Sequence, residues 1–209
     1  MPLPAGKTVI NGGNLTIRTL SPVDSGLYEC VATNSMGSKK AKMNVVVQQQ
    51  PSRVNCDCWR SRSKSRSGSW VIGPGLVDAI DFQTNGDVIL QGYRLWGVYS
   101  GSTTYQVTIR LYRGSSMIAE KTGSYFSRST DQTFEVHFSQ EISIRAGVLY
   151  TATSQITGAE SHAHTDGMSS ASCSGVTVTF IKSSKDINGS DVSNGQIPAL
   201  IFRSRQCQK

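Results

Sequence analysis

The chain has 209 residues, of which 37% are hydrophobic and 17% charged, which is typical of a globular protein with one good core and a smaller second unit. No apolar run approaches the roughly 18 residues that span a bilayer, and the first residues lack the apolar core of a signal peptide, which taken literally predicts a chain that starts inside the cell. The net charge of +7 lies mostly outside the central body. Residues 52–68 hold five basic side chains and one acidic, whereas residues 69–203 hold nine basic and eleven acidic side chains. Nucleic-acid binding by the body is therefore not favoured.

The first predicted unit, residues 1–47, contains an immunoglobulin-like strand pattern. Residues 24–30, DSGLYEC, match D-x-G-x-Y-x-C, in which the tyrosine hydroxyl bonds back to the corner before the strand and the cysteine faces the opposite sheet. With strands expected at 14–17 and 41–47, the segment resembles the back half, strands E to G, of an I-set immunoglobulin domain. No cysteine precedes Cys30, and the core tryptophan of strand C is absent. We therefore expect a partial, marginally stable unit and interpret the chain as a fragment of a longer protein.

Residues 48–68 are polar and alternate Arg or Lys with Ser, which predicts a flexible, solvated, basic linker. Two alternatives also leave these residues at the surface: contact with an anionic surface or nucleic acid, and control by serine phosphorylation. Cys56 and Cys58 are too sparse for a zinc site, because four ligands are required and no second pair of suitable spacing follows.

The body, residues 69–203, is built around a pair of strand-like runs. In the second run, large apolar side chains alternate with polar ones, as in a half-buried antiparallel strand. These apolar residues are Tyr105, Val107, Ile109 and Leu111. The first run, 88–98, carries apolar groups on both faces, so we expect a central strand. Gly92 and Gly97 within it predict a bulge or the close approach of another backbone.

Further apolar runs follow at the spacing of an all-β sandwich, and no amphipathic helix of useful length is present. These runs are 117–119, 134–138, 148–156, 176–180 and 199–202. We therefore predict an all-β fold, an antiparallel two-sheet β-sandwich, followed by a short tail at 204–209. The expected core residues include Tyr93, Trp96, Tyr105 and Phe134.

Several short motifs of the body occur in a recognisable order. They are Trp70, 78–82 (DAIDF), 92–97 (GYRLWG), 105–109 (YQVTI), 148–152 (VLYTA), 158–167 (GAESHAHTDG) and 194–202 (NGQIPALIF). Together they resemble the PHR domain, named for the Pam, Highwire and RPM proteins. The resemblance covers residues 69–203, about two thirds of the chain, and implies a sandwich with jelly-roll-like connections.

The PHR resemblance also implies a role in recognition. PHR domains recruit partner or substrate proteins, either in BTB-containing adaptors of cullin ubiquitin ligases or in very large neuronal RING ligases. The BTB and RING parts are absent from this sequence, so a ubiquitin-pathway function does not carry over. The immunoglobulin neighbour and the cysteines favour an extracellular or secreted setting, whereas the ligase relatives favour the cytoplasm.

The densest polar segment of the body is 160–166, ESHAHTD. Its Glu, His, His and Asp share one parity and would project to one side of an extended chain, a conceivable metal site. Flanking glycines and serines favour a loop instead, and the PHR resemblance implies a loop here, although His164 departs from a commoner glycine. We predict no metal, no cofactor, and a partner-binding surface formed by 158–168 and the turn 98–104. Its candidate residues are Ser100, Glu160, Ser161, His162, His164 and Asp166.

The cysteines near the ends of the body suggest a covalent link. Because domain termini often lie close together, Cys207 bonded to Cys56 or Cys58 would join the ends in an oxidising compartment and add roughly 2–4 kcal/mol. Cys173 lies in a serine-rich segment and is expected to be free.

The predicted function is non-catalytic protein–protein recognition by the loops of a PHR-like sandwich. An enzyme is not predicted, because His137 has the position of a solvent-facing strand residue and no G-x-S-x-G motif occurs. Two alternatives stay open: an extracellular sandwich that binds a small ligand or carbohydrate, and an anion- or nucleic-acid-binding protein that acts through residues 60–66.

Overall fold

The structure is a computed structural model that describes residues 3–47, 54–173 and 175–204. The chain divides into two compact units, Met1–Ser52 and Arg53–Lys209, called unit 1 and unit 2 here. Within the described residues the regular structure is β-strand apart from one short 3-10 helix, η1 (Pro22–Asp24). No helix in this part of the chain has the length and apolar character of a membrane span. The predicted all-β class is confirmed.

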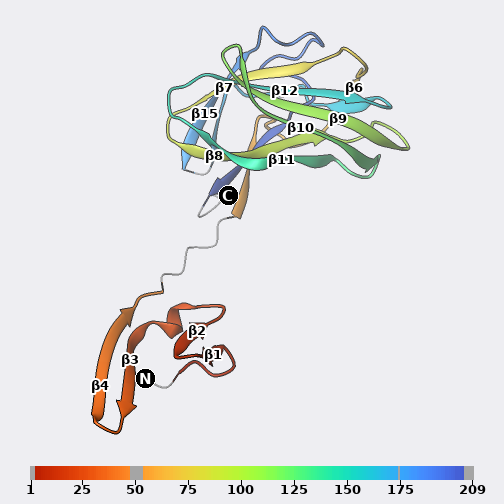
Figure 1. The fold of residues 1–209 in the computed structure, drawn as a ribbon. Coiled ribbons are helices and arrows are strands. Elements are labelled where there is room, and N and C mark those ends of the chain that lie inside the picture. The colour runs from red at the N-terminus through yellow and green to blue at the C-terminus, as the bar shows by residue number, and fades with distance from the viewer. Residues whose placement is uncertain (1–2, 48–53, 174, 205–209) are drawn as a thin grey trace. The chain divides into compact units, whose positions relative to one another are not determined.

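Unit 1 consists of two antiparallel hairpins (Figure 1). Their strands are β1 (Thr8–Asn11), β2 (Asn14–Ile17), β3 (Gly26–Asn34) and β4 (Gly37–Val45). The Tyr28 hydroxyl donates a hydrogen bond to the Asp24 carbonyl oxygen at 2.7 Å, which is the corner that the tyrosine pattern predicted. Among the described residues of unit 1, Tyr28 and Asp24 are the only buried ones, so this unit has almost no core.

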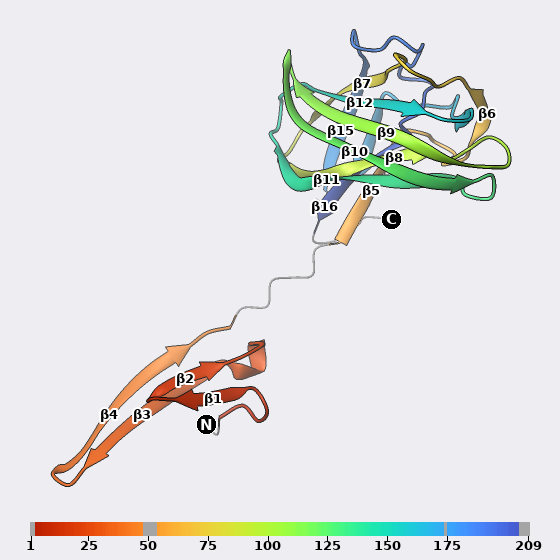
Figure 2. The same cartoon turned by 45° about the vertical axis from the view of Figure 1, so that its right-hand side comes forward.

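Unit 2 is a sandwich of two antiparallel sheets (Figures 1 and 2). The six-stranded sheet has the order β10-β9-β12-β7-β15-β14, and the four-stranded sheet has the order β11-β8-β16-β5. The first contains β7 (Asp78–Thr84), β9 (Ser102–Arg113), β10 (Ser116–Arg128), β12 (Tyr150–Thr157), β14 (Ser170–Cys173) and β15 (Val176–Lys182). The second contains β5 (Val54–Trp59), β8 (Val88–Trp96), β11 (Thr133–Ile144) and β16 (Ala199–Ser204). A separate pair joins β6 (Ser67–Trp70) to β13 (Ser161–Ala163).

The core lies between the two sheets and is supplied by alternating side chains. The four apolar residues of β9 are each 0% exposed, which confirms the period-2 prediction. Tyr93 and Trp96 of β8 are also fully buried, and β8 is an interior strand as predicted. Each such side chain contributes about 1.5–3 kcal/mol on burial. Phe134 is half-buried, with its ring stacked between those of Tyr105 and Tyr125 at 5.7 Å from each.

The two predicted glycines allow neighbouring backbone to approach β8 closely. A Cβ on Gly92 would lie 2.1 Å from the Val136 carbonyl oxygen, and one on Gly97 would lie 2.5 Å from the Asp131 carbonyl oxygen. At Gly92 the registers of β8 with both β11 and β16 shift. The predicted close approach is therefore confirmed at both positions.

β5 lies inside the segment predicted as a linker, so that prediction was wrong for residues 54–68. β5 pairs with β16 along its whole length and forms an edge of the four-stranded sheet. Cys56 and Cys58 are buried, whereas Asp57 between them is half-exposed and accepts a hydrogen bond from Arg94 at 3.0 Å. This alternation is strand-like, but the run of Arg, Lys and Ser that follows it concealed the pattern.

A disulfide joins Cys58 of β5 to Cys173 of β14, the edge strands of the two sheets. Two predictions are therefore wrong: Cys173 is not free, and Cys58 is not the partner of Cys207. The packing of the sheets brings the two Cα atoms to 5.3 Å although they are 115 positions apart. Cys56 is also disulfide-bonded. Because Cys207 lies outside the described residues, its pairing with Cys56 stays a prediction.

Candidate partner-binding rim

One end of unit 2 gathers four segments that are far apart in the sequence. They are residues 61–68, which include the loop after β5 and the first two residues of β6, the turn 97–101 between β8 and β9, residues 126–131 around the end of β10, and residues 160–167 around β13. We call these four segments the rim. Figure 2 shows β6 and the end of β12 on the same side of unit 2 as the turns that follow β8 and β10.

Backbone hydrogen bonds join the two segments that were predicted to bind a partner. The Tyr99 N–H donates to the Glu160 carbonyl oxygen at 2.9 Å, and the His162 N–H donates to the Gly97 carbonyl oxygen at 2.8 Å. The turn after β8 and the segment around β13 therefore lie side by side and form one continuous surface.

Three further contacts attach the remaining rim segments. The Ser129 N–H donates to the Gly101 carbonyl oxygen at 2.8 Å, and the Arg66 guanidinium donates to the Ser129 carbonyl oxygen at 2.6 Å. The Asp166 carboxylate accepts a hydrogen bond from the Ser63 N–H at 2.6 Å. Residues 61–68 are thus held against the other three rim segments, and strands of two sheets carry the whole surface.

Three of the six predicted contact residues are buried, which corrects the prediction for them. Ser161 and His164 are 0% exposed and His162 is 7% exposed. β13 carries or adjoins all three and pairs with β6 on one side, while Ser161 bridges to Val98 on the other. Sequence reasoning missed this cover because β6 begins in the segment assigned to the linker.

His164 supports the rim from below. The Trp96 indole N–H donates to His164 Nδ1 at 3.1 Å, which assigns the proton of the neutral ring to Nε2. Burial, and to a smaller extent the charge of Arg60, lower the pKa of His164 to about 3. The ring is therefore neutral near pH 7. Burial also lowers the pKa of His162, whose Nδ1 lies 3.3 Å from the Gly68 carbonyl oxygen.

The other three predicted residues are accessible. Ser100 and Glu160 are exposed, and Asp166 is half-buried. Burial would raise the pKa of Asp166, but hydrogen bonds from Ser63 and Ser61 outweigh it and lower that pKa. Asp166 is therefore a carboxylate that orders the loop 61–68, while Ser100 and Glu160 keep the role predicted for them as a proposal.

Sequence reasoning missed two exposed aromatic side chains of the rim. Tyr99 is 46% exposed and Phe126 is 56% exposed. The Arg128 guanidinium lies 5.3 Å from the centre of the Phe126 ring, and the Tyr99 ring meets the His162 ring edge-on at 5.1 Å. On β10 the alternation of exposed Phe126 and Arg128 with a buried serine was the available indication.

Arg60 was predicted to be solvated but is 1% exposed. Its guanidinium donates to the carbonyl oxygens of Asp191, Val192, Asn194 and Ile197. Burial lowers its pKa to about 10, although Asp78 and Asp191 act in the opposite direction, so Arg60 stays charged near pH 7. It fixes the end of β5 and thereby the start of the rim loop.

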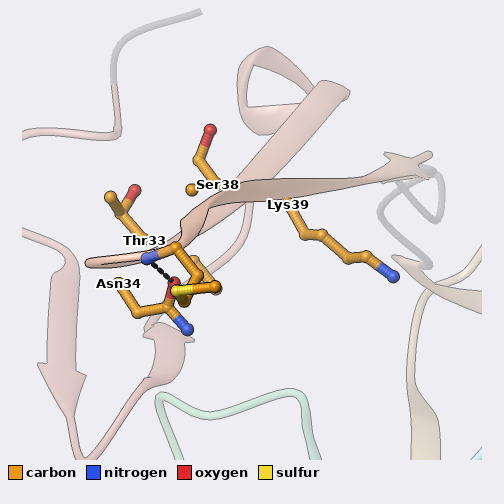
Figure 3. A pocket seen from close by; sticks show the side chains of 7 residues that line it. Thr33, Asn34, Ser38 and Lys39 are labelled. Atoms are coloured by element: carbon orange, nitrogen blue, oxygen red, sulfur yellow. Dashed lines mark hydrogen bonds between the residues drawn. The ribbon is translucent and has the colours of Figure 1, made fainter.

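Unit 1 has an open hollow at the turn between β3 and β4 (Figure 3). Its lining includes Thr33, Asn34, Ser38 and Lys39. The Asn34 side-chain oxygen accepts a hydrogen bond from the Met36 N–H at 2.9 Å, so it stabilises the turn itself. All lining residues are exposed, and none offers the buried polar group that orients a small ligand.

Comparison with known families matches residues 61–203 to the PHR domain and residues 7–47 to the immunoglobulin I-set domain. BTB/POZ domain-containing protein 3 of Mus musculus is 35% identical over 185 residues, which cover 85% of this chain and 35% of that protein. The protein of the same name from Homo sapiens is 34% identical with the same coverage. BTB/POZ domain-containing protein 6 of Homo sapiens is 34% identical over 147 residues, 69% of this chain and 27% of that protein. The chain thus spans about a third of the length of these relatives.

Proposed function

The chain belongs to the PHR domain family, and from this premise we propose that unit 2 is a non-catalytic module that binds a partner protein through its rim. The resemblance inferred from the sequence is confirmed over residues 61–203 for the PHR domain and over 7–47 for the I-set domain. The relatives are named for a BTB/POZ domain, and this chain spans about a third of their length. The proposal therefore concerns the PHR module alone, and the carbohydrate-binding alternative is not favoured.

The observation that carries the proposal is the build of the rim. Tyr99, Phe126 and Arg128 expose side-chain types that are enriched at protein interfaces, and Tyr and Arg are also frequent among the residues that contribute most to binding energy. Tyr99 lies on the turn after β8, whereas Phe126 and Arg128 lie at the end of β10, and backbone hydrogen bonds join the turns of the rim to one another. Loops held in this way lose little conformational freedom on binding, which favours affinity.

The three histidines make structural contacts. His164 and His162 are buried and engaged in structural contacts. His137 lies on β11, where its Nε2 is 2.8 Å from a carboxylate oxygen of Glu135. Within the described residues no hydrogen bond joins an imidazole to a serine or cysteine side chain, which is the pairing that nucleophilic catalysis uses.

The test is affinity capture with the full 209-residue chain from extracts of its source cells, followed by binding measurements on the purified partner. The rim variant is Tyr99→Ser with Phe126→Ser, and we expect it to weaken binding by about tenfold or more. The matched control is Met117→Ser with Ile118→Ser, which removes side chains that are 51% and 40% exposed at the opposite end of β10. Circular dichroism checks that both variants are folded.

Binding by the control at the parent affinity, together with loss in the rim variant, would support the proposal. Equal binding by the two variants would place the contact surface elsewhere on the molecule. Retention of glycans or small ligands alone would favour the carbohydrate-binding alternative over protein recognition.

A further inference from the structure

The rim carries positive charge that has no ionic partner. Elsewhere in unit 2, four arginines are paired with carboxylates, whereas Arg113 at the end of β9 forms no ion pair within the described residues. The four paired arginines are Arg94, Arg110, Arg145 and Arg203. In the described part of the chain, no carboxylate forms an ion pair with any basic side chain of the rim. The rim cations are Arg62, Lys64, Arg66 and Arg128, of which Arg66 is half-buried and the others are exposed.

The fold holds these charges in fixed places. Ser61 bridges to Gly167, and the Arg62 N–H donates to the Asp166 carbonyl oxygen at 3.3 Å. Lys64 has a φ of 54°, a left-handed turn conformation, which makes it part of the tight bend between β5 and β6. The Arg66 guanidinium bonds to the carbonyl of Ser129, the residue after Arg128. The basic run that the sequence assigned to a linker is thus part of the rim.

We propose that the segment recognised by the rim is an acidic peptide that carries an apolar or aromatic side chain. This inference rests on the proposed function and adds the chemistry of the partner. Arg62, Lys64, Arg66 and Arg128 would bind its carboxylates, and guanidinium groups suit this role because they can donate two parallel hydrogen bonds. Phe126 and Tyr99 supply an apolar contact beside the charges. Because residues 69–203 hold nine basic and eleven acidic side chains, the rest of the body would not compete for such a peptide.

Carboxylates within the rim favour a peptide over a nucleic acid. Glu160 is exposed, and Asp131 and Asp166 lie in the same four segments. A nucleic acid presents a continuous row of phosphates, and these three side chains would repel it. A peptide can place a few acidic residues opposite the cations and keep neutral ones opposite Glu160.

The test measures fluorescence anisotropy of a labelled dodecapeptide in which Glu alternates with Ser around a central Phe. A version with Gln for Glu and a dodecathymidylate serve as comparison probes for the full chain. We expect the Glu peptide to bind most tightly and to lose affinity as salt is added. Arg62→Gln with Lys64→Gln should weaken it about fivefold, as expected for two exposed charges. The control, Arg113→Gln with Lys182→Gln, makes the same charge change at exposed positions outside the rim and should bind like the parent.

Three results would overturn the inference: tighter binding of the thymidylate, equal losses in the two double variants, or no peptide binding below about 1 mM. The outcome is separable from that of the proposed function. If Tyr99→Ser with Phe126→Ser abolishes capture of the natural partner while Arg62→Gln with Lys64→Gln leaves it unchanged, the rim still binds protein and the acidic chemistry is wrong.

Discussion

Mild acid is expected to destabilise unit 2 through the buried ring of His164. Its pKa is lowered to about 3, mainly by burial, from the value of 6.5 that an unfolded chain would show. Between these two values the unfolded chain binds a proton that the folded chain does not. The contribution of His164 to stability is therefore complete above about pH 6.5 and decreases as the pH falls toward 3.

The loss of stability at pH 5 depends almost entirely on the pKa of this histidine in the unfolded chain. Each pH unit below it costs about 1.36 kcal/mol, so the free energy of unfolding should fall by about 2 kcal/mol between pH 7 and pH 5. Any folded pKa below about 4 gives nearly the same figure. His162, whose pKa is also lowered by burial, adds to the loss. The pKa of Asp166 is lowered, whereas burial raises the pKa of Asp78, so the contribution of His164 is identified by comparing variants and not by the choice of pH alone.

Urea unfolding followed by tryptophan fluorescence measures this loss in unit 2 alone, because Trp59, Trp70 and Trp96 are the three tryptophans of the chain. The test variant is His164→Gln, and the control is His137→Gln at a half-buried position on β11. The control should keep the parent's dependence on pH, whereas His164→Gln should flatten it even if the variant is less stable at pH 7. A loss of the same size in both variants would refute the assignment to His164.

Two further predictions concern the covalent link and the glycine contact. Replacing Cys58 and Cys173 by Ala should lower the free energy of unfolding by roughly 4 kcal/mol, because the bond spans 115 positions. Urea unfolding measures this, and a loss no larger than that of Cys30→Ser, which alters an exposed free thiol, would contradict it. Gly92→Ala should cost about 3 kcal/mol, since its Cβ would lie 2.1 Å from a carbonyl oxygen of β11. A thermal unfolding midpoint equal to that of Gly73→Ala, whose Cβ meets nothing closer than 4.0 Å, would count against this estimate.

The sequence predicted the fold where one side of a strand is buried and the other is not. β9 shows this alternation at four apolar positions and was identified. The same rule applied to residues 54–58 indicates β5. β5 was missed because its inward positions are cysteines and the basic serine-rich run follows directly. The disulfide could not be predicted correctly, since the meeting of Cys58 with Cys173 depends on how the two sheets pack.

The sequence predicted which segments form the rim but not which side chains the rim exposes. Residues 98–104 and 158–168 do lie together, whereas His162 and His164 point inward because β6 covers β13. Phe126 belongs to the rim through the register of β10 with β9, which pairs it with Thr104. Such a register depends on contacts between strands and cannot be read from the local pattern around either residue.

The position of β16 determines when the four-stranded sheet of unit 2 can be completed during synthesis. β16 lies between β8 and β5, and Ala199 pairs with Trp59, 140 positions earlier. Among the described strands, β16 is the only ladder partner of β5, so β5 leaves the ribosome long before that partner exists. Until residues 199–204 emerge, the nascent chain exposes unpaired edges on β5 and β8, where chaperones would bind and premature aggregation would begin.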